Sequence, residues 1–128
     1  MKIRILDNAI RLRLSQSEVL LLAEKGLVRA KTHFGPAKDQ IFTYSVQNYS
    51  GEQIIAAYEH QEIKVLIPAQ TSSIWANSEE ISLRSVMNID QHQELSILVE
   101  KDFKCLDPNR PEDESDLFPH PKQDELSC

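Results

Sequence analysis

Glycine and cysteine are both scarce in this chain of 128 residues. Three glycines are too few for the glycine-rich loop with which many nucleotide-binding proteins hold phosphates. Two cysteines, Cys105 and Cys128, do not make a disulfide framework, and in a reducing cytosol we expect both to be free thiols. The sequence therefore argues against a phosphate loop of that kind and against a disulfide-stabilised fold.

Long apolar runs are missing as well. No run approaches the roughly 20 residues that a transmembrane helix needs. The first residues, Met-Lys-Ile-Arg-Ile, carry a charge at every second position and so lack the apolar core of a signal peptide. The hydrophobic content of 41% is typical of a soluble globular chain. We therefore expect a cytoplasmic protein that does not contact a membrane.

Charge is unevenly distributed along the chain, whose net charge is −6. Residues 1–53 carry eight Lys/Arg and five Asp/Glu (+3), residues 54–106 carry four and eight (−4), and residues 107–128 carry two and seven (−5). From Asp107 onward the chain is polar, acidic and interrupted by prolines, which is typical of an extended or disordered tail. We therefore expect a single domain over residues 1–106 and an acidic tail over residues 107–128.

The pattern of apolar residues repeats after 53 positions. A shift of that length aligns residues 1–53 with residues 54–106, although few of the aligned residues are identical. Apolar residues coincide, for example, in the pairs Ile10/Ile63, Leu12/Val65, Leu14/Ile67, Val28/Ile81, Ala30/Leu83, Phe34/Met87 and Val46/Val99. Such a repeat indicates that the domain consists of two structural repeats, residues 1–53 and 54–106.

Each copy is predicted to follow the order strand, strand, helix, strand, strand. Alternation of polar and apolar residues predicts strands at Lys2–Leu6, Ile10–Leu14, Val28–Phe34 and Ile41–Val46, and again at Ile54–Glu59, Ile63–Ile67, Ile81–Met87 and Leu95–Glu100. In the first copy, Ser15 and Glu18 form a capping-box pattern that begins a helix, and Gly26 is suited to end it.

In the second copy, Pro68 suits the first turn of a helix at about Ala69–Asn77, which is expected to present Ile74 and Trp75 to the core. The predicted fold class is therefore α+β. It combines an internally duplicated unit, about eight mostly antiparallel strands and two short helices in a pseudo-twofold barrel or sandwich.

Part of the second copy resembles a known structural unit. Ile63-Lys64-Val65-Leu66-Ile67-Pro68, followed by a short helix and a hairpin, is similar to the swapped-hairpin unit of the AbrB/SpoVT-like family. The first copy departs from that pattern, because Ser15 stands where the proline would be. The resemblance implies two units paired into one small barrel, and either DNA binding or a MazE-type antitoxin role in which an acidic tail engages a toxin.

The chain as a whole resembles an uncharacterised bacterial family of short proteins. The matching features are Ile10–Val19, Thr32–Pro36, Val99–Leu106 and the acidic ending Glu112–Pro119. This resemblance spans nearly the whole chain and implies no activity.

Basic side chains occupy the outward positions of three predicted strands. They are Lys2, Arg4, Arg11, Arg13, Arg29, Lys31 and His33. If the three strands are neighbours, these charges form one patch that can attract phosphates. The alternatives are an ordinary solvated sheet face that resists edge aggregation, and a docking site for the chain's own tail through Glu112, Asp113, Glu114, Asp116, Leu117 and Phe118.

Metal and catalytic chemistry have weaker support. Cys105, His120 and Cys128 are the natural metal ligands, but the chain has no Cys-x-x-Cys pair and lacks the usual zinc spacing. Nucleophilic catalysis would need Cys105 to meet a base such as His33, and no spacing indicates that they meet. We therefore assign no metal, no cofactor and no catalytic residue.

These observations favour a non-enzymatic cytoplasmic binding or regulatory module. The acidic tail and the basic sheet face are its candidate contact surfaces for a protein partner, whose identity the sequence does not give. The first alternative is an AbrB-like nucleic-acid-binding or antitoxin-type protein, although the negative net charge disfavours nucleic acid. The second alternative is a small metal-binding protein or enzyme.

Overall fold

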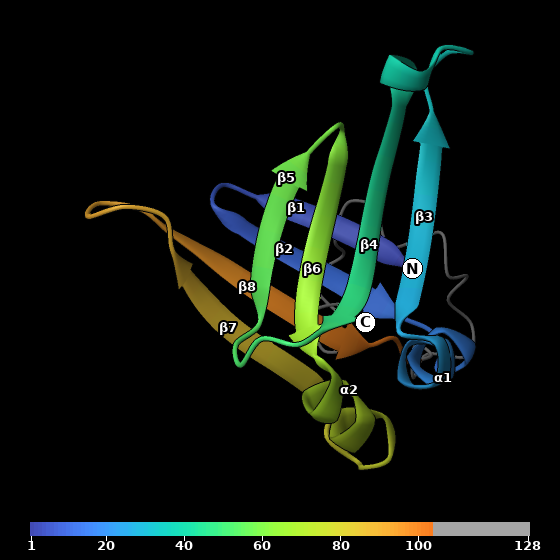
Figure 1. Ribbon diagram of the computed structural model, residues 1–128, viewed down its shortest axis with the longest axis vertical. Coiled ribbons are helices and arrows are strands. Elements are labelled where there is room, and N and C mark those ends of the chain that lie inside the picture. Colours follow the sequence, from blue (N-terminus) through green and yellow to red (C-terminus); the bar gives the residue numbers. More distant parts are fainter. Residues whose placement is uncertain (104–128) are drawn as a thin grey trace, which may run out of the picture.

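The computed structural model describes residues 1–103, in which the chain forms eight strands and two α-helices (Figure 1). The predicted tail at residues 107–128 lies outside the described residues. In chain order the elements are β1 (Lys2–Leu6), β2 (Ala9–Leu14), α1 (Gln16–Lys25), β3 (Leu27–His33), the short 3-10 helix η1 (Lys38–Gln40), β4 (Ile41–Tyr49), β5 (Ile55–Glu59), β6 (Glu62–Pro68), α2 (Ala69–Ala76), β7 (Ser82–Asn88) and β8 (Glu94–Lys101). The order ββαββ occurs twice, and the α+β fold class is as predicted.

The strands form two four-stranded sheets, and each sheet takes one hairpin from each ββαββ unit. Sheet A has the order β1-β2-β8-β7, and sheet B has the order β3-β4-β6-β5. The two central strands of each sheet are parallel, and the other pairs are antiparallel. In Figure 1 the strands of one sheet cross those of the other as two layers. Within residues 1–103 the sheets are not closed into a barrel, so of the two predicted arrangements the sandwich is the one observed.

The hydrogen-bond register of sheet A is repeated in sheet B. Between the central strands, Ala9 faces Ser96 in sheet A, and Glu62 faces Thr43 in sheet B, which is the same pair after a shift of 53 positions. The hairpins β1–β2 and β5–β6 correspond in the same way. Each position on one sheet therefore has a structural counterpart on the other.

The predicted constant offset of 53 is wrong for one strand. Val28 pairs with Val46 in β3–β4, but the corresponding pair in β7–β8 is Leu83 with Val99, so β7 is offset by 55. Its predicted first residue, Ile81, lies before the strand. The cause is the helix and the connection after it, because α2 has eight residues against ten in α1, whereas five residues separate α2 from β7 and one separates α1 from β3, a net gain of two. Since two is an even number, the slip leaves the inward and outward faces of the strand unchanged.

Local sequence explains where the helices begin and end. The side chain of Ser15 accepts a hydrogen bond from the Glu18 N–H, and Glu18 Oε1 accepts one from the Ser15 N–H at 2.9 Å, so the predicted capping box is formed. Gly26 ends α1 in the left-handed conformation, with φ of 78°. Helix α2 begins at Ala69 as predicted, but Pro68 is its N-cap and the last residue of β6 rather than part of its first turn.

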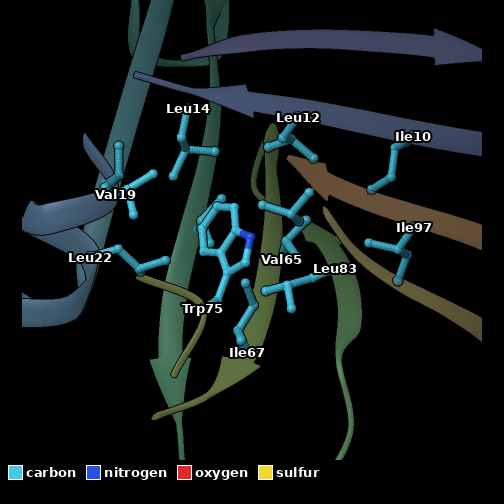
Figure 2. Close-up of a cluster of buried hydrophobic side chains, with 13 residues drawn as sticks. Ile10, Leu12, Leu14, Val19, Leu22, Val65, Ile67, Trp75, Leu83 and Ile97 are labelled. Carbon is cyan, nitrogen blue, oxygen red and sulfur yellow. The ribbon is translucent and has the colours of Figure 1, made fainter. Parts of the chain in front are cut away.

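The core lies between the two sheets and receives side chains from both of them and from both helices (Figure 2). Its buried members are Ile10, Leu12, Leu14, Val19, Leu22, Val28, Val46, Val65, Ile67, Trp75, Leu83, Ile97 and Val99. Figure 2 places the indole of Trp75 in the middle of the cluster, and its Nε1–H donates to the Ile81 carbonyl at 3.2 Å. Burial of the Trp75 side chain is complete, as predicted.

The prediction that Ile74 is buried in the core is wrong, because this side chain is 56% exposed. Neighbouring residues on an α-helix point about 100° apart. Helix α2 buries Ser72 and Trp75, which lie three residues apart on one face, and Ile74 points away from that face.

We expect Trp75→Ala to lower the free energy of unfolding by roughly 3–5 kcal/mol, the usual cost of deleting a large aromatic side chain from a core. Chemical denaturation followed by circular dichroism measures this. Ile74→Ala on the same helix is the matched control and should cost less than about 1 kcal/mol, because its side chain is exposed. Trp75 is the chain's single tryptophan, so a native emission maximum like that of free tryptophan would contradict its burial.

Glu18 gives a second prediction, about pH. Burial raises the pKa of Glu18, but hydrogen bonds from the N-terminal ammonium and from Ser15, together with the ammonium charge, outweigh burial and lower the pKa below its usual value. The ammonium lies 2.6 Å from Glu18 Oε2. A lowered pKa in the folded state gives stability that is present above the unfolded pKa and is lost as pH falls through the folded pKa.

Replacing Glu18 by Gln should therefore destabilise the protein by about 1 kcal/mol at pH 7, and the difference from wild type should shrink as pH falls from the unfolded pKa through the lower folded pKa. Urea unfolding of both proteins between pH 7 and pH 3 measures it. Glu24→Gln, an exposed position on the same helix, should cost nothing measurable at either pH. A Glu18 deficit that is equal at pH 7 and pH 3 would show that the charge is not involved.

Candidate functional site

The seven predicted basic residues lie on two different sheets. Lys2 and Arg4 on β1 face Arg13 and Arg11 on β2, and all four point to the outer face of sheet A, away from sheet B. The other three, Arg29, Lys31 and His33, are exposed along β3 in sheet B. The strands β2 and β3 are not neighbours, so the structure brings four of these residues together and separates them from the remaining three.

A fifth basic side chain, Arg84 on β7, joins the first four on the outer face of sheet A. One row of this face runs across all four strands and contains Arg4, Arg11, Leu98 and Arg84. The next row contains Leu6, Ala9, Ser96 and Val86. These residues line a hollow with a volume of about 590 Å³, and we call it the sheet A hollow. Three guanidinium groups lie in its first row, and its apolar lining comes from Leu98 in that row and from Leu6, Ala9 and Val86 in the next.

Sequence reasoning did not select Arg84. Alternation along Ser82–Asn88 is enough to place Arg84 on the outward side of its strand. Which sheet that strand joins is decided by the pairing of β7 with β8 and of β8 with β2. No local signal could have placed Arg84 beside Arg4 and Arg11.

Some of these cations are neutralised within the described residues. Glu100 Oε1 accepts hydrogen bonds from Arg11 Nε at 2.6 Å and from Arg13 Nε at 2.7 Å. Lys2 Nζ lies 3.0 Å from Asp102 Oδ2. The Glu100 carboxylate therefore holds the Arg11 guanidinium in place at one side of the hollow.

Arg4 and Arg84 differ from these three. Over residues 1–103 no acidic side chain pairs with either of them. They lie on the two edge strands of sheet A, one at each side of the hollow. The hollow therefore has two cationic groups that are not neutralised by any described acidic group.

The corresponding face of sheet B is built differently. At the positions equivalent to Leu6 and Ala9, sheet B has Glu59 and Glu62. These acids neutralise the cations beside them: Glu62 lies 3.5 Å from Arg29, which is the counterpart of Arg84, and Glu59 lies 3.4 Å from Lys64.

The centre of that face is closed as well. Ser45 is the counterpart of Leu98, and its hydroxyl donates to Glu62 Oε2 at 2.7 Å. Gln47 donates to the same hydroxyl at 3.2 Å, and Ser45 is fully buried beneath these side chains. The two sheets thus share one backbone register but not one surface, because Glu62 pairs with Arg29 on sheet B, whereas Arg84, its counterpart on sheet A, has no described acidic partner.

The candidate metal ligands and tail residues predicted from the sequence lie outside the described residues. Cys105, His120, Cys128 and the tail residues from Glu112 to Phe118 lie beyond the described range. Across residues 1–103, no group of three or more His, Cys, Asp or Glu side chains is arranged to hold a metal ion. No helix in that range is both long and apolar enough to cross a membrane.

The chemistry of the sheet A hollow is that of a binding surface. Guanidinium groups bind carboxylates or phosphates through charge-assisted, often bidentate, hydrogen bonds. Leu6, Val86 and Leu98 offer an apolar surface for a side chain or an acyl group. Among the described residues that line the hollow there are arginines and serines but no His, Cys, Asp or Glu that could act as a general base.

Comparison with known proteins places the chain in a family. No curated protein and no solved structure matches it. The model of a family described as being of unknown function (DUF7009) matches residues 1–122, which is nearly the whole chain. This agrees with the resemblance of the sequence to an uncharacterised family of short proteins, and the chain belongs to this family of unknown function.

Proposed function

We propose that the protein is a non-enzymatic, cytoplasmic binding module that holds an acidic peptide segment of a partner protein in the sheet A hollow. The observation that carries this proposal is the combination of Arg4 and Arg84, which no described acid neutralises, with the apolar side chains of Leu6, Val86 and Leu98 beside them in the same hollow. The same positions on sheet B supply the contrast, because there Ala57 stands in place of Arg4, and Arg29, the counterpart of Arg84, lies 3.5 Å from Glu62.

The partner segment should combine carboxylates with at least one large apolar side chain. Exposed ion pairs contribute only about 0–1 kcal/mol each, so arginines alone give weak binding. Burying one leucine or phenylalanine side chain contributes roughly 1.5–3 kcal/mol. Leu6 and Val86 are both more than half exposed in the hollow, which leaves apolar area for such a side chain to cover.

Nucleic acid is a poorer fit to the same surface. The seven basic residues chosen from the sequence are divided between the outer faces of two sheets, so they do not form one track for a phosphate backbone. Arg11 and Arg13 are also neutralised in part by Glu100. The net charge of −6 repels a long polyanion.

A peptide titration tests the proposal. The probe is a fluorescent synthetic peptide, Arg-Pro-Glu-Asp-Glu-Ser-Asp-Leu-Phe-Pro, and a second version has serine in place of leucine and phenylalanine. We expect Arg4→Gln/Arg84→Gln to weaken binding of the first peptide several-fold, since each lost ion pair contributes up to about 1 kcal/mol, which corresponds to about fivefold. Val86→Ser should weaken the first peptide several-fold and leave the second unchanged.

Arg29→Gln is the matched control for this titration. It removes the counterpart of Arg84 on sheet B, where Glu62 already neutralises the charge, and it should change the dissociation constant less than twofold. The proposal is wrong if the peptide binds no protein at millimolar concentration, or if Arg29→Gln weakens it as much as Arg4→Gln/Arg84→Gln does.

A gel-shift experiment addresses nucleic acid separately. We expect no shift of a random 30-base-pair DNA duplex at physiological salt, because the division of the basic residues and the negative net charge both oppose binding. A shift that weakens steeply with added salt and disappears in Arg11→Glu/Arg13→Glu would instead establish nucleic-acid binding by sheet A.

A further inference from the structure

The described chain ends shortly after β8, and Asp102 near this end lies on the outer face of sheet A. The N–H of Asp102 donates to the Leu14 carbonyl at 2.8 Å, directly after β8. Its carboxylate lies 3.0 Å from Lys2 Nζ, on the same face as Arg13 and Glu100. The last described residue is Phe103, and 25 further residues follow it.

Acidic residues from this end of the chain already neutralise part of the basic face. Glu100 pairs with Arg11 and Arg13, and Asp102 pairs with Lys2. Arg4 and Arg84, at the two sides of the sheet A hollow, have no acidic partner among the described residues. The residues that follow carry seven Asp/Glu and two Lys/Arg between positions 107 and 128, a net charge of −5.

The order of residues in this segment matches the chemistry of the hollow. Four acids, Glu112, Asp113, Glu114 and Asp116, are followed at once by Leu117 and Phe118. Carboxylates suit the arginines, and the leucine and phenylalanine suit the apolar side chains of Leu6, Val86 and Leu98 beside them. The probe peptide Arg-Pro-Glu-Asp-Glu-Ser-Asp-Leu-Phe-Pro is residues 110–119 of this chain, and it combines both properties.

The segment is long enough to reach the hollow. Glu112 is nine residues beyond Phe103 (112 − 103), a span of up to about 30 Å. Leu98, at the middle of the hollow, is four residues back along β8 from Asp102, or about 13 Å. A tether of this length gives an effective concentration in the millimolar range, so weak contacts suffice for occupancy.

A second hollow near the end of the described chain is a poorer match. It has a volume of about 1200 Å³ and lies at the start of α1, next to Phe103. Lys101 is its single cation and Asp102 lies beside it, so it offers no net positive charge to an acidic run.

We infer that residues 112–118 of the chain occupy the sheet A hollow of the same molecule and compete there with the partner segment. This inference rests on the proposed function, and it makes the tail an intramolecular inhibitor of binding. A partner then gains access by outcompeting the tail or by drawing it away.

The test uses the full chain with a neutralised tail, in which Glu112 and Glu114 are changed to Gln, Asp113 and Asp116 to Asn, and Leu117 and Phe118 to Ser. We expect this variant to bind the acidic probe peptide at least fivefold more tightly than wild type. Adding Arg4→Gln/Arg84→Gln should abolish the gain. Methyl resonances of Leu6, Val86 and Leu98 should shift between wild type and the neutralised-tail variant at equal protein concentration.

A charge-matched control separates competition from a change in net charge. Changing Glu24, Glu52, Glu79 and Glu80 to Gln also removes four negative charges, at exposed positions away from the sheet A hollow. This control should bind the probe within twofold of wild type. A gain equal to that of the neutralised-tail variant would overturn the inference.

The remaining outcomes are also decisive. If wild type and the neutralised-tail variant bind the probe equally, the tail does not occupy the hollow, and the proposed function stands without it. If neither binds the probe, the proposed function itself is wrong. If the methyl shifts of wild type depend on protein concentration, the tail occupies the hollow of a second copy, and the intramolecular inference is overturned.

Discussion

The two parallel strand pairs, β2 with β8 and β4 with β6, are the contacts on which the rest of the structure depends. Each joins a hairpin of the first ββαββ unit to a hairpin of the second. An isolated two-stranded hairpin is at best marginally stable in water, so neither unit could bury its apolar face alone. Pairing turns four hairpins into two sheets, and the sheets then enclose a common core around Trp75.

The same pairing creates the candidate site. Arg4 and Arg11 come from the first unit, and Arg84 and Leu98 from the second, so the sheet A hollow exists only when β2 and β8 are paired. Sheet B repeats the register with different side chains, and there Glu62, in place of Ala9, pairs with Arg29 and accepts a hydrogen bond from Ser45. The repeated backbone supplies the scaffold, and a few outward residues decide what each face can bind.

Electrostatics explains how a chain of net charge −6 can carry a basic surface. The cations are concentrated on strands near the N-terminus, and the acids are concentrated after β8. The ion pairs of Glu100 and Asp102 with sheet A already join these two regions. They are short-range contacts, and they leave Arg4 and Arg84 without a described acidic partner.

The sequence by itself determined the local elements and their order. Alternation placed the strands to within a few residues, and the Ser15–Glu18 capping box and Gly26 defined helix α1 correctly, because these signals act between residues that are neighbours in the chain. Alternation also assigned inward and outward faces, which is why Lys2, Arg4, Arg11 and Arg13 were correctly expected to point away from the core.

Only the tertiary structure decided which strands are neighbours. Ile10 pairs with Ile97, 87 residues away, and alternation is the same whichever strand lies alongside. For this reason the residues of the predicted basic patch lie on two different sheets, and Arg84 lies beside Arg4 and Arg11. The packing of helix α2 likewise leaves Ile74 exposed and Trp75 buried in the core. The physical reason is that a side chain's direction follows from its local backbone, whereas its neighbours follow from long-range packing of apolar faces that many sequence-compatible pairings could satisfy.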